Sequence, residues 1–235
     1  MTIHELVASL EPEINAVRQQ IHENPELGLK EYNTSALIEK ELREKTHVDR
    51  IEHIGETGLL VEIKGTKPGT AHCIALRGDM DALPIKEDES HELRSRTDGI
   101  MHACGHDVHT SILLGAVRVL EHYRNQIAGS ILFFFQPSEE TLQGGKLFAE
   151  SPKIDFHTID GVAALHVTPD LCAGKIGVRY GAILGSSDEL TITVKETPIS
   201  AVIDGHDGMG QLLGHKAMEM AIEKAKKSGV GIVSV

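Results

Sequence analysis

The chain has 235 residues, enough to bury a substantial core as one large domain or as a domain with a small appendage. Its 23 basic and 35 acidic residues give a formal net charge of −12, which argues against unspecific nucleic-acid binding, and scarce aromatic residues argue against stacking on single strands. No apolar run approaches membrane-spanning length, no signal-like core follows the N-terminus, and three cysteines without a close pair favour a reducing compartment. We therefore expect a soluble cytoplasmic α/β protein.

The first 63 residues predict two helices and a strand. Apolar residues from Leu6 to Ile21 recur every three or four positions, which predicts an amphipathic helix that ends before Pro25. The segment around Ala36 to Glu41 predicts a second helix with a charged outer face, and Leu59 to Ile63 alternates loosely, as strands do. These elements supply architecture rather than chemistry.

Acidic or imidazole side chains follow three later apolar runs, each of which predicts a buried strand. The runs and the residues after them are 73–76 with Asp79 and Asp81, 131–135 with Glu139 and Glu140, and 162–165 with His166. In open α/β sheets the chemistry gathers at the carboxyl ends of the strands, so these side chains should converge in one site.

Each of these groups has a plain alternative reading. Asp79 and Asp81 could belong to a solvated turn before Pro84. Ser138 is a good N-cap, and two acids after it would suit the first turn of a helix. Only the shared position after strands favours a functional role.

A dense group of metal-ligand residues lies between the first two of these runs. Within residues 99–110, Cys104 is flanked by His102, His106 and His109, and thiolate and imidazole are preferred ligands of zinc and its neighbours. In an extended stretch the side chains of His102, Cys104 and His106 would point the same way, and a helix beginning near His106 would bring His109 towards them. The alternative is that Cys104 is a small buried hydrophobe and the histidines are satisfied locally. A helix is also predicted from Ile112 to Tyr123.

Five ordered segments resemble the aminoacylase/carboxypeptidase family of metal-dependent amidohydrolases, in the branch of hippurate hydrolases and plant auxin-conjugate hydrolases. They are Gln20–Gly28, Arg77–Pro84, Met101–His109, Gln136–Glu140 and Leu165–Val167. The resemblance implies an α/β catalytic domain, an open mixed sheet flanked by helices, into which a smaller lid or dimerisation domain is inserted. It also implies up to two divalent metal ions, which could be zinc, manganese, cobalt or nickel.

The resemblance also assigns roles to individual residues. Cys104, His106, Glu140 and His166 match the metal ligands, Glu139 matches the general base, and Asp81 matches an acid that orients a ligand histidine or stabilises the site; the role of Asp79 stays open. In such a site a bound cation lowers the pKa of water towards about 7 and a carboxylate moves the proton. The implied partners are a small N-acyl amino acid as substrate and a second copy of the chain in a homodimer.

The resemblance stops near Val194. The lid motif Gly-Gly-His-Gly and a last histidine ligand do not follow. The tail instead resembles the malate/L-lactate dehydrogenases that use nicotinamide cofactors, which predicts a chimera. The matching stretches are Glu196–Pro198, Ala201–Gly205, Gly208–Gln211, Lys216–Glu219, Ile222–Lys226 and Gly229–Val235. We therefore divide the chain into residues 1–185, the N-terminal part of a catalytic domain, and residues 186–235, a truncated lid start fused to a dehydrogenase-like segment.

The periodicity of the tail predicts a βαβ-like unit. Its elements are a strand at Leu190–Val194, a helix at Gln211–Lys227 and a strand at Val230–Val235. The glycine-rich turn at 204–208 lacks the register of a phosphate-binding loop. His206 and His215 are better explained as surface histidines than as substitute ligands.

Three functions follow as hypotheses. The first is hydrolysis of N-acyl amino acids or related small amides, impaired by the missing lid and ligand. The second is a catalytically inactive metal-binding remnant or structural protein. The third, less favoured, is a fragment of an NAD-dependent malate/lactate dehydrogenase. An exposed sheet edge left by missing strands should also favour self-association.

Overall fold

The computed structural model describes residues 1–178, 180–181, 186–194 and 197–205. The chain divides into two units, Met1–Thr168 and Pro169–Val235. The helices are α1 (Ile3–Glu23), α2 (Tyr32–Lys45), α3 (His106–His122) and α4 (Gly144–Ala149), with short 3-10 turns at Arg124–Gln126 and Phe156–Thr158. The strands are β1 (Arg50–Ile54), β2 (Gly58–Lys64), β3 (His72–Asp79), β4 (Gly129–Gln136), β5 (Gly161–Ala164), β6 (Ser186–Val194) and β7 (Thr197–Gly205).

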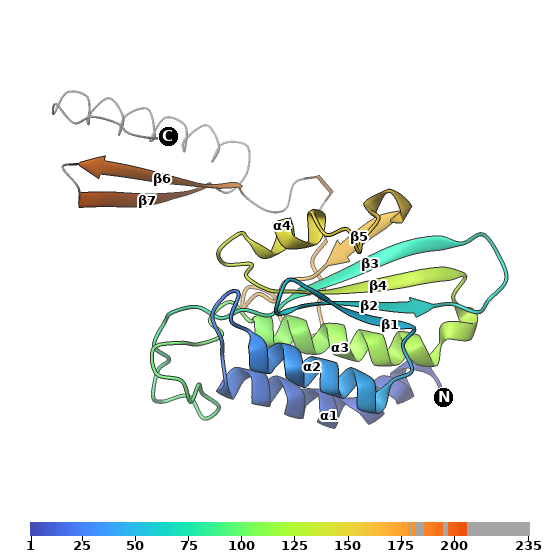
Figure 1. Cartoon of the computed structure of the whole chain (residues 1–235). Coiled ribbons are helices and arrows are strands. Elements are labelled where there is room, and N and C mark those ends of the chain that lie inside the picture. Colours follow the sequence, from blue (N-terminus) through green and yellow to red (C-terminus); the bar gives the residue numbers. More distant parts are fainter. Residues whose placement is uncertain (179, 182–185, 195–196, 206–235) are drawn as a thin grey trace. The chain divides into compact units, whose positions relative to one another are not determined.

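The first unit is a five-stranded open sheet with helices on its faces (Figure 1). The strand order is β1-β2-β4-β3-β5. The pairs β1–β2 and β2–β4 are antiparallel, whereas β4–β3 and β3–β5 are parallel. The expected open mixed sheet flanked by helices is therefore confirmed.

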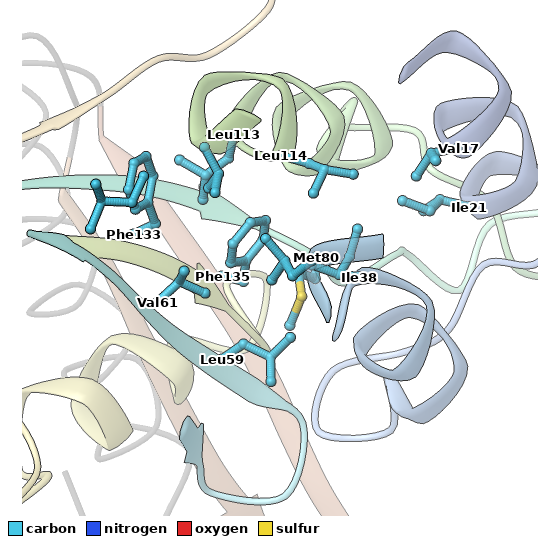
Figure 2. Close-up of a cluster of buried hydrophobic side chains, with 13 residues drawn as sticks. Val17, Ile21, Ile38, Leu59, Val61, Met80, Leu113, Leu114, Phe133 and Phe135 are labelled. Atoms are coloured by element: carbon cyan, nitrogen blue, oxygen red, sulfur yellow. The ribbon is translucent and has the colours of Figure 1, made fainter. Parts of the chain in front are cut away.

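Alternation along β4 divides the core between the two faces of the sheet, because successive side chains of a strand point to opposite faces. Phe133 and Phe135 are fully buried against α1, α2 and α3 (Figure 2). Leu132 and Phe134 face the other side, where Phe148 of α4 packs against them. Burying the side chain of a large apolar residue contributes about 1.5–3 kcal/mol, so these two clusters hold the sheet in place beneath the site.

The expected elements of this unit are found. The first helix ends at Glu23, two residues before Pro25, and its N-terminus carries a capping box in which Thr2 and Glu5 satisfy each other's backbone amides. The helix predicted from Ile112 begins earlier, at His106. One expectation is wrong: β5 is not a buried strand, because it pairs at the edge of the sheet and Val162 is 58% exposed.

The second unit contains a β-hairpin in its described part. The strands β6 and β7 are antiparallel, with Leu190 opposite Ala201. The strand predicted at 190–194 is confirmed, but a second strand follows it where the sequence suggested a helix as the next element. The predicted helix at 211–227 and strand at 230–235 lie outside the described residues. The division at residue 185 stays a prediction.

Among the described residues, none of the helices combines the length and the apolar character that crossing a membrane requires.

Candidate metal centre

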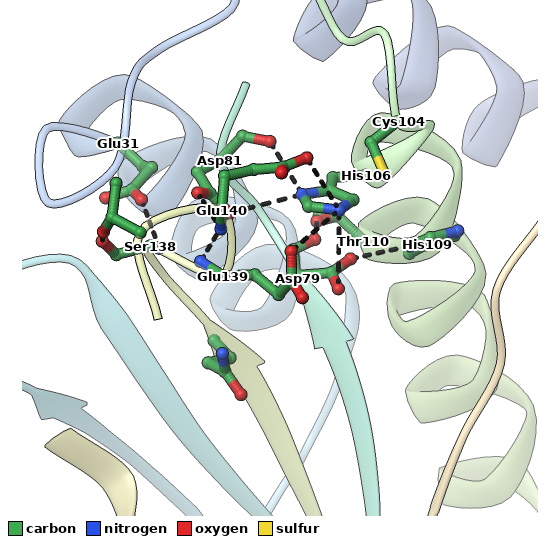
Figure 3. Close-up of polar contacts among 12 residues, drawn as sticks. Glu31, Asp79, Asp81, Cys104, His106, His109, Thr110, Ser138, Glu139 and Glu140 are labelled. Atoms are coloured by element: carbon green, nitrogen blue, oxygen red, sulfur yellow. Dashed lines mark hydrogen bonds and ion pairs between the residues drawn. The ribbon is translucent and has the colours of Figure 1, made fainter. Parts of the chain in front are cut away.

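Three parallel strands bring the predicted site residues to one edge of the sheet. Asp79 ends β3, Glu139 and Glu140 follow β4, and His166 follows β5. The N-terminus of α3 adds His106 at the same edge, and Figure 3 shows it facing the acidic residues. The expected convergence is confirmed, because the carboxyl ends of parallel strands lie side by side.

His106 lies at the centre of the site and is almost completely buried. Its Nδ1 lies 2.9 Å from the backbone oxygen of Asp81 and 3.3 Å from the Oδ1 of the same residue. Both neighbours are acceptors, so Nδ1 must carry a proton and donate it. The other ring nitrogen, Nε2, is buried and has no hydrogen-bond partner. Asp81 thus fixes the tautomer that leaves Nε2 free as a ligand.

Asp81 also holds the acidic turn after β4. Its Oδ1 accepts the amide N–H of Glu139 at 2.9 Å, and its Oδ2 accepts that of Glu140 at 3.0 Å. The carboxylates of both glutamates then reach His106 Nε2 at 3.7 Å. Asp81 is fully enclosed, so the solvated-turn alternative is wrong for it, as it is for the equally buried Asp79.

The helix-cap alternative for Glu139 and Glu140 is also wrong. Ser138 is not an N-cap: it has φ +53°, and α4 begins only at Gly144, after Gln143 as its N-cap. The two acids therefore lie in a turn that presents them to His106 rather than in the first turn of a helix.

Cys104 and His166 lie next to each other and complete the group of candidate ligands around His106. Cys104 Sγ lies 3.3 Å from His166 Nε2. The other nitrogen of His166 donates to the backbone oxygen of Val167 at 2.7 Å, so the Nε2 of a neutral His166 directs a lone pair at the sulfur. One ligand atom from each of Cys104, His106 and His166 lies within 4.8 Å of the others, as do those of His106, Glu139 and Glu140.

A second network of hydrogen bonds, built on Asp79 and His109, supports the centre. Asp79 Oδ1 accepts a hydrogen bond from His109 Nδ1 at 2.7 Å, and Arg77 donates to Oδ2 at 2.6 Å. His109 Nε2 accepts the amide N–H of Val167 at 3.0 Å. Both nitrogens of His109 are thus occupied, which makes it a support for the His166 segment rather than a free ligand, although its atoms lie within ligand distance of Asp79 and His106.

The charges of this centre perturb its titration. Burial alone would lower the pKa of His106, but hydrogen bonds to Asp81 and Cys104 and the charge of Asp79 raise it to about 11. Burial alone would raise the pKa of Asp79, but the His109 hydrogen bond and the His106 and Arg77 charges lower it to about 2. Burial raises the pKa of Glu139, and the charges of Asp79 and Glu140 add to that rise. The surrounding carboxylates therefore favour a second proton on His106, at Nε2, and a divalent cation bound there would take the place of that proton.

The residues present fit a divalent cation. His106 Nε2 and Glu140 Oε1 are both buried without a hydrogen-bond partner, and they face each other at 3.7 Å. Orphaned buried polar atoms are costly, and a cation between them would satisfy both. The donor set of a thiolate, imidazoles and carboxylates is the one that zinc and its neighbours prefer.

His102 does not join this centre. The backbone bends at Ala103 and Cys104, so the side-chain alternation expected for an extended stretch is interrupted. His102 is instead buried beside His22, with ring centroids 6.3 Å apart, and burial lowers its pKa to about 4.

Sequence reasoning missed two supports of the site. Asp107 accepts from Arg18 at 2.7 Å and lies 2.9 Å from His22 Nδ1, which ties α1 to the start of α3. Glu31 accepts the amide N–H of Ser138 at 2.8 Å. Neither residue carries a local sequence signal, because an acid at the start of a helix is ordinary. Asp107 lies within the matched segment Met101–His109 and Glu31 lies just after the matched segment Gln20–Gly28, but the resemblance assigned a role to neither residue.

Comparison with known proteins agrees with the geometry. The chain is 35% identical over 217 residues to an N-acetyl-L-cysteine deacetylase of Bacillus subtilis, a match that covers 92% of this chain and 51% of that protein. It is 38% identical over 180 residues to an IAA-amino acid hydrolase of Arabidopsis thaliana, covering 76% of this chain and 40% of that one. The chain thus spans about half the length, or less, of these curated relatives.

A solved structure shares the fold. A dinuclear metal-binding peptidase of the M20 family from Bacillus subtilis superposes with a TM-score of 0.72 and 34% identity, over 80% of this chain and 52% of that one. The family described as peptidase family M20/M25/M40 matches residues 75–232, which include most of the tail compared above with dehydrogenases, and the comparisons lend no support to that second resemblance. The chain belongs to the M20/M25/M40 family of peptidases, a family of hydrolases.

Proposed function

We propose that this chain is the catalytic part of a metal-dependent amidohydrolase that cleaves linear amides. The observation that carries the proposal is the pair of orphaned buried atoms, His106 Nε2 and Glu140 Oε1, facing each other at 3.7 Å within an anionic cage. Family membership and the dinuclear structural relative support it.

Cys104, His106, Glu140 and His166 are the residues proposed to hold the metal, with up to two divalent ions per chain. When bound, such ions lower the pKa of water and polarise the scissile carbonyl. The thiolate favours zinc, while manganese, cobalt and nickel remain compatible with the imidazole and carboxylate donors. Asp81 orients His106 and fixes the acidic turn rather than touching the substrate.

Glu139 is the proposed general base. Its amide is fixed by Asp81 while its carboxylate stays partly exposed, with a side-chain exposure of 36%, so water and substrate can reach it. Burial raises its pKa, which makes it a better proton acceptor at neutral pH than an ordinary glutamate. It takes a proton from the attacking water as the carbon–oxygen bond forms, and returns it to the leaving nitrogen as the carbon–nitrogen bond breaks.

N-acyl amino acids are the proposed substrate class. The names of the two relatives, a deacetylase of N-acetyl-L-cysteine and a hydrolase of IAA-amino acids, both describe cleavage of an amide on an amino acid. Assembly as a homodimer and a cytoplasmic location complete the proposal. We propose that the activity depends on added divalent ions. The dehydrogenase-like interpretation of the tail stays a prediction.

Turnover of N-acetyl and benzoyl amino acids, measured together with metal content, tests this function. Glu139→Gln should lose at least about 100-fold of the activity while it retains metal, because the proton acceptor is lost and the ligands stay. Glu150→Gln, at an exposed glutamate paired with Lys146, is the matched control and should be unaffected.

Full activity of Glu139→Gln would reject the mechanism. Bound metal without turnover in the unaltered chain would favour the inactive metal-binding protein instead.

A further inference from the structure

The turn that carries Glu139 and Glu140 is held by its backbone amides. Three successive N–H groups, those of Ser138, Glu139 and Glu140, each donate to a carboxylate oxygen. Asp81 accepts the second and third, and Glu31 accepts the first (Figure 3). Charge-assisted hydrogen bonds of this kind are about twice as strong as neutral ones.

Ser138 needs this support because its backbone is strained. It has φ +53° although it is not a glycine, a left-handed conformation that persists only where the surroundings impose it. The residue is completely buried. The backbone of Gly28 packs so closely on it that a Cβ at position 28 would lie 2.7 Å from Ser138 Oγ.

Glu31 is built into this contact. Its Oε1 accepts the amide N–H of Leu29 at 3.1 Å as well as that of Ser138, and its Oε2 accepts the hydroxyl of Thr57 at 2.7 Å. The residue has no exposed surface, and burial raises its pKa. A buried carboxylate is costly to retain, and one of its three hydrogen bonds goes to the strained residue directly before Glu139 and Glu140.

We propose that Glu31 is a positioning residue: it holds Ser138 in its left-handed conformation and thereby sets where the Glu139 and Glu140 carboxylates stand relative to His106. This inference rests on the proposed function for the role of those two glutamates. Glu31 itself lies behind the turn and acts only through Ser138. Supporting residues of this kind alter metal affinity or activity by about 10–100-fold when they are changed.

Three variants of the full chain separate positioning from bulk stability. Glu31→Leu removes all three hydrogen bonds. Glu31→Gln keeps its carbonyl oxygen towards Leu29 and Ser138, and its amide group can donate to the Thr57 hydroxyl, so it should rescue the geometry. Thr57→Val removes the hydrogen bond between Thr57 and Glu31 but leaves the one between Ser138 and Glu31. It is therefore the matched control for the loss of a buried hydrogen bond.

Two measurements report the outcome. The first is hydrogen exchange of the Ser138 amide, which should be at least about tenfold faster in Glu31→Leu and nearly unchanged in Glu31→Gln and Thr57→Val. The second is titration with Co²⁺, followed by the visible cobalt bands and by the thiolate-to-cobalt band that reports on Cys104. Glu31→Leu should bind Co²⁺ at least about tenfold more weakly, with altered visible bands, while the other two variants match the unaltered chain.

The proposal is overturned if Ser138 exchange and the cobalt spectrum of Glu31→Leu match those of the unaltered chain. It is also overturned if Thr57→Val weakens Co²⁺ binding as much as Glu31→Leu, since loss of stability would then explain both. If the unaltered chain bound no Co²⁺, the proposed function would fail, and unaltered Ser138 exchange in Glu31→Leu would still decide against the role of Glu31. If Glu31→Leu does not fold, Glu31→Gln is measured in its place. Weaker Co²⁺ binding by Glu31→Gln than by the unaltered chain would then contradict the proposal, which expects this variant to keep the geometry of the turn.

Discussion

Asp81→Asn tests whether one carboxylate organises the centre. The Oδ1 of Asp81 accepts a hydrogen bond from the Glu139 amide and faces His106 Nδ1, and its Oδ2 accepts a hydrogen bond from the Glu140 amide. All of these neighbours are donors. An asparagine can keep its oxygen on the Oδ1 side, but its NH₂ group must then face the N–H of Glu140, donor against donor.

The cost follows from that geometry. In the least disruptive orientation of the asparagine side chain, the Glu140 N–H loses its hydrogen bond to a charged acceptor and stays buried without a partner. Losing such a hydrogen bond costs about 1–3 kcal/mol. We therefore expect Asp81→Asn to lower the free energy of unfolding by about 2 kcal/mol. Because the side chain is fully buried, water cannot replace the lost acceptor.

Urea unfolding of the full chain in the presence of a chelator measures this loss without any contribution from bound metal. Asp160→Asn is the matched control: its carboxylate also accepts a backbone amide, that of Cys73 at 2.8 Å, but its side chain is 50% exposed. Water can replace that hydrogen bond, so the loss should be much smaller. A similar loss in both variants, or a loss below about 0.5 kcal/mol in Asp81→Asn, would refute the reasoning.

Two further predictions follow from the ligands and from the support behind them. Zinc at about 100 times its Kd should stabilise the unaltered chain by about 2.7 kcal/mol. Cys104→Ser should lose most of that stabilisation, whereas Cys73→Ser, at the other half-buried cysteine, should keep it. Equal zinc-induced thermal shifts in the two variants would contradict a thiolate ligand at Cys104. The hydrogen bond to Asp107 raises the pKa of His22, so the stability that charged His22 adds is fully present below its unfolded pKa of about 6.5 and is lost as pH rises through the raised value. The difference in unfolding free energy between the unaltered chain and His22→Gln should therefore shrink as the pH rises above about 6.5, and a constant difference would be evidence against the ion pair.

The elements of the first unit were predictable because their signals are local. The spacing of apolar residues marked α1, and the apolar runs marked β3 and β4. The placing of acids and a histidine directly after strands predicted the convergence, because parallel strands end at a common edge. The strand β7 was not predicted, because no ordered chemistry or clear periodicity marks it, and the helix predicted at 211–227 lies outside the described residues.

The details of the site could not be predicted because they depend on partners far apart in the chain. Glu31 and Ser138 are separated by 107 positions, and Asp81 and Glu139 by 58. Ser138 is a residue type that commonly caps helices, yet the hydrogen bond that its amide donates to the distant Glu31 carboxylate and the close approach of Gly28 impose a strained turn. His102 has the spacing of a ligand, yet local bends bury it beside His22.

By itself the sequence determined the helices α1 to α3, the strands β2 to β4, the edge of the sheet at which the chemistry gathers, and the donor types of a metal centre. Only the tertiary structure decided which nitrogen of His106 stays free, that both nitrogens of His109 are occupied, and which carboxylates hold the acidic turn. The reason is physical: periodicity and residue type act over a few neighbouring positions, whereas the availability of a lone pair depends on every group that folding packs around it.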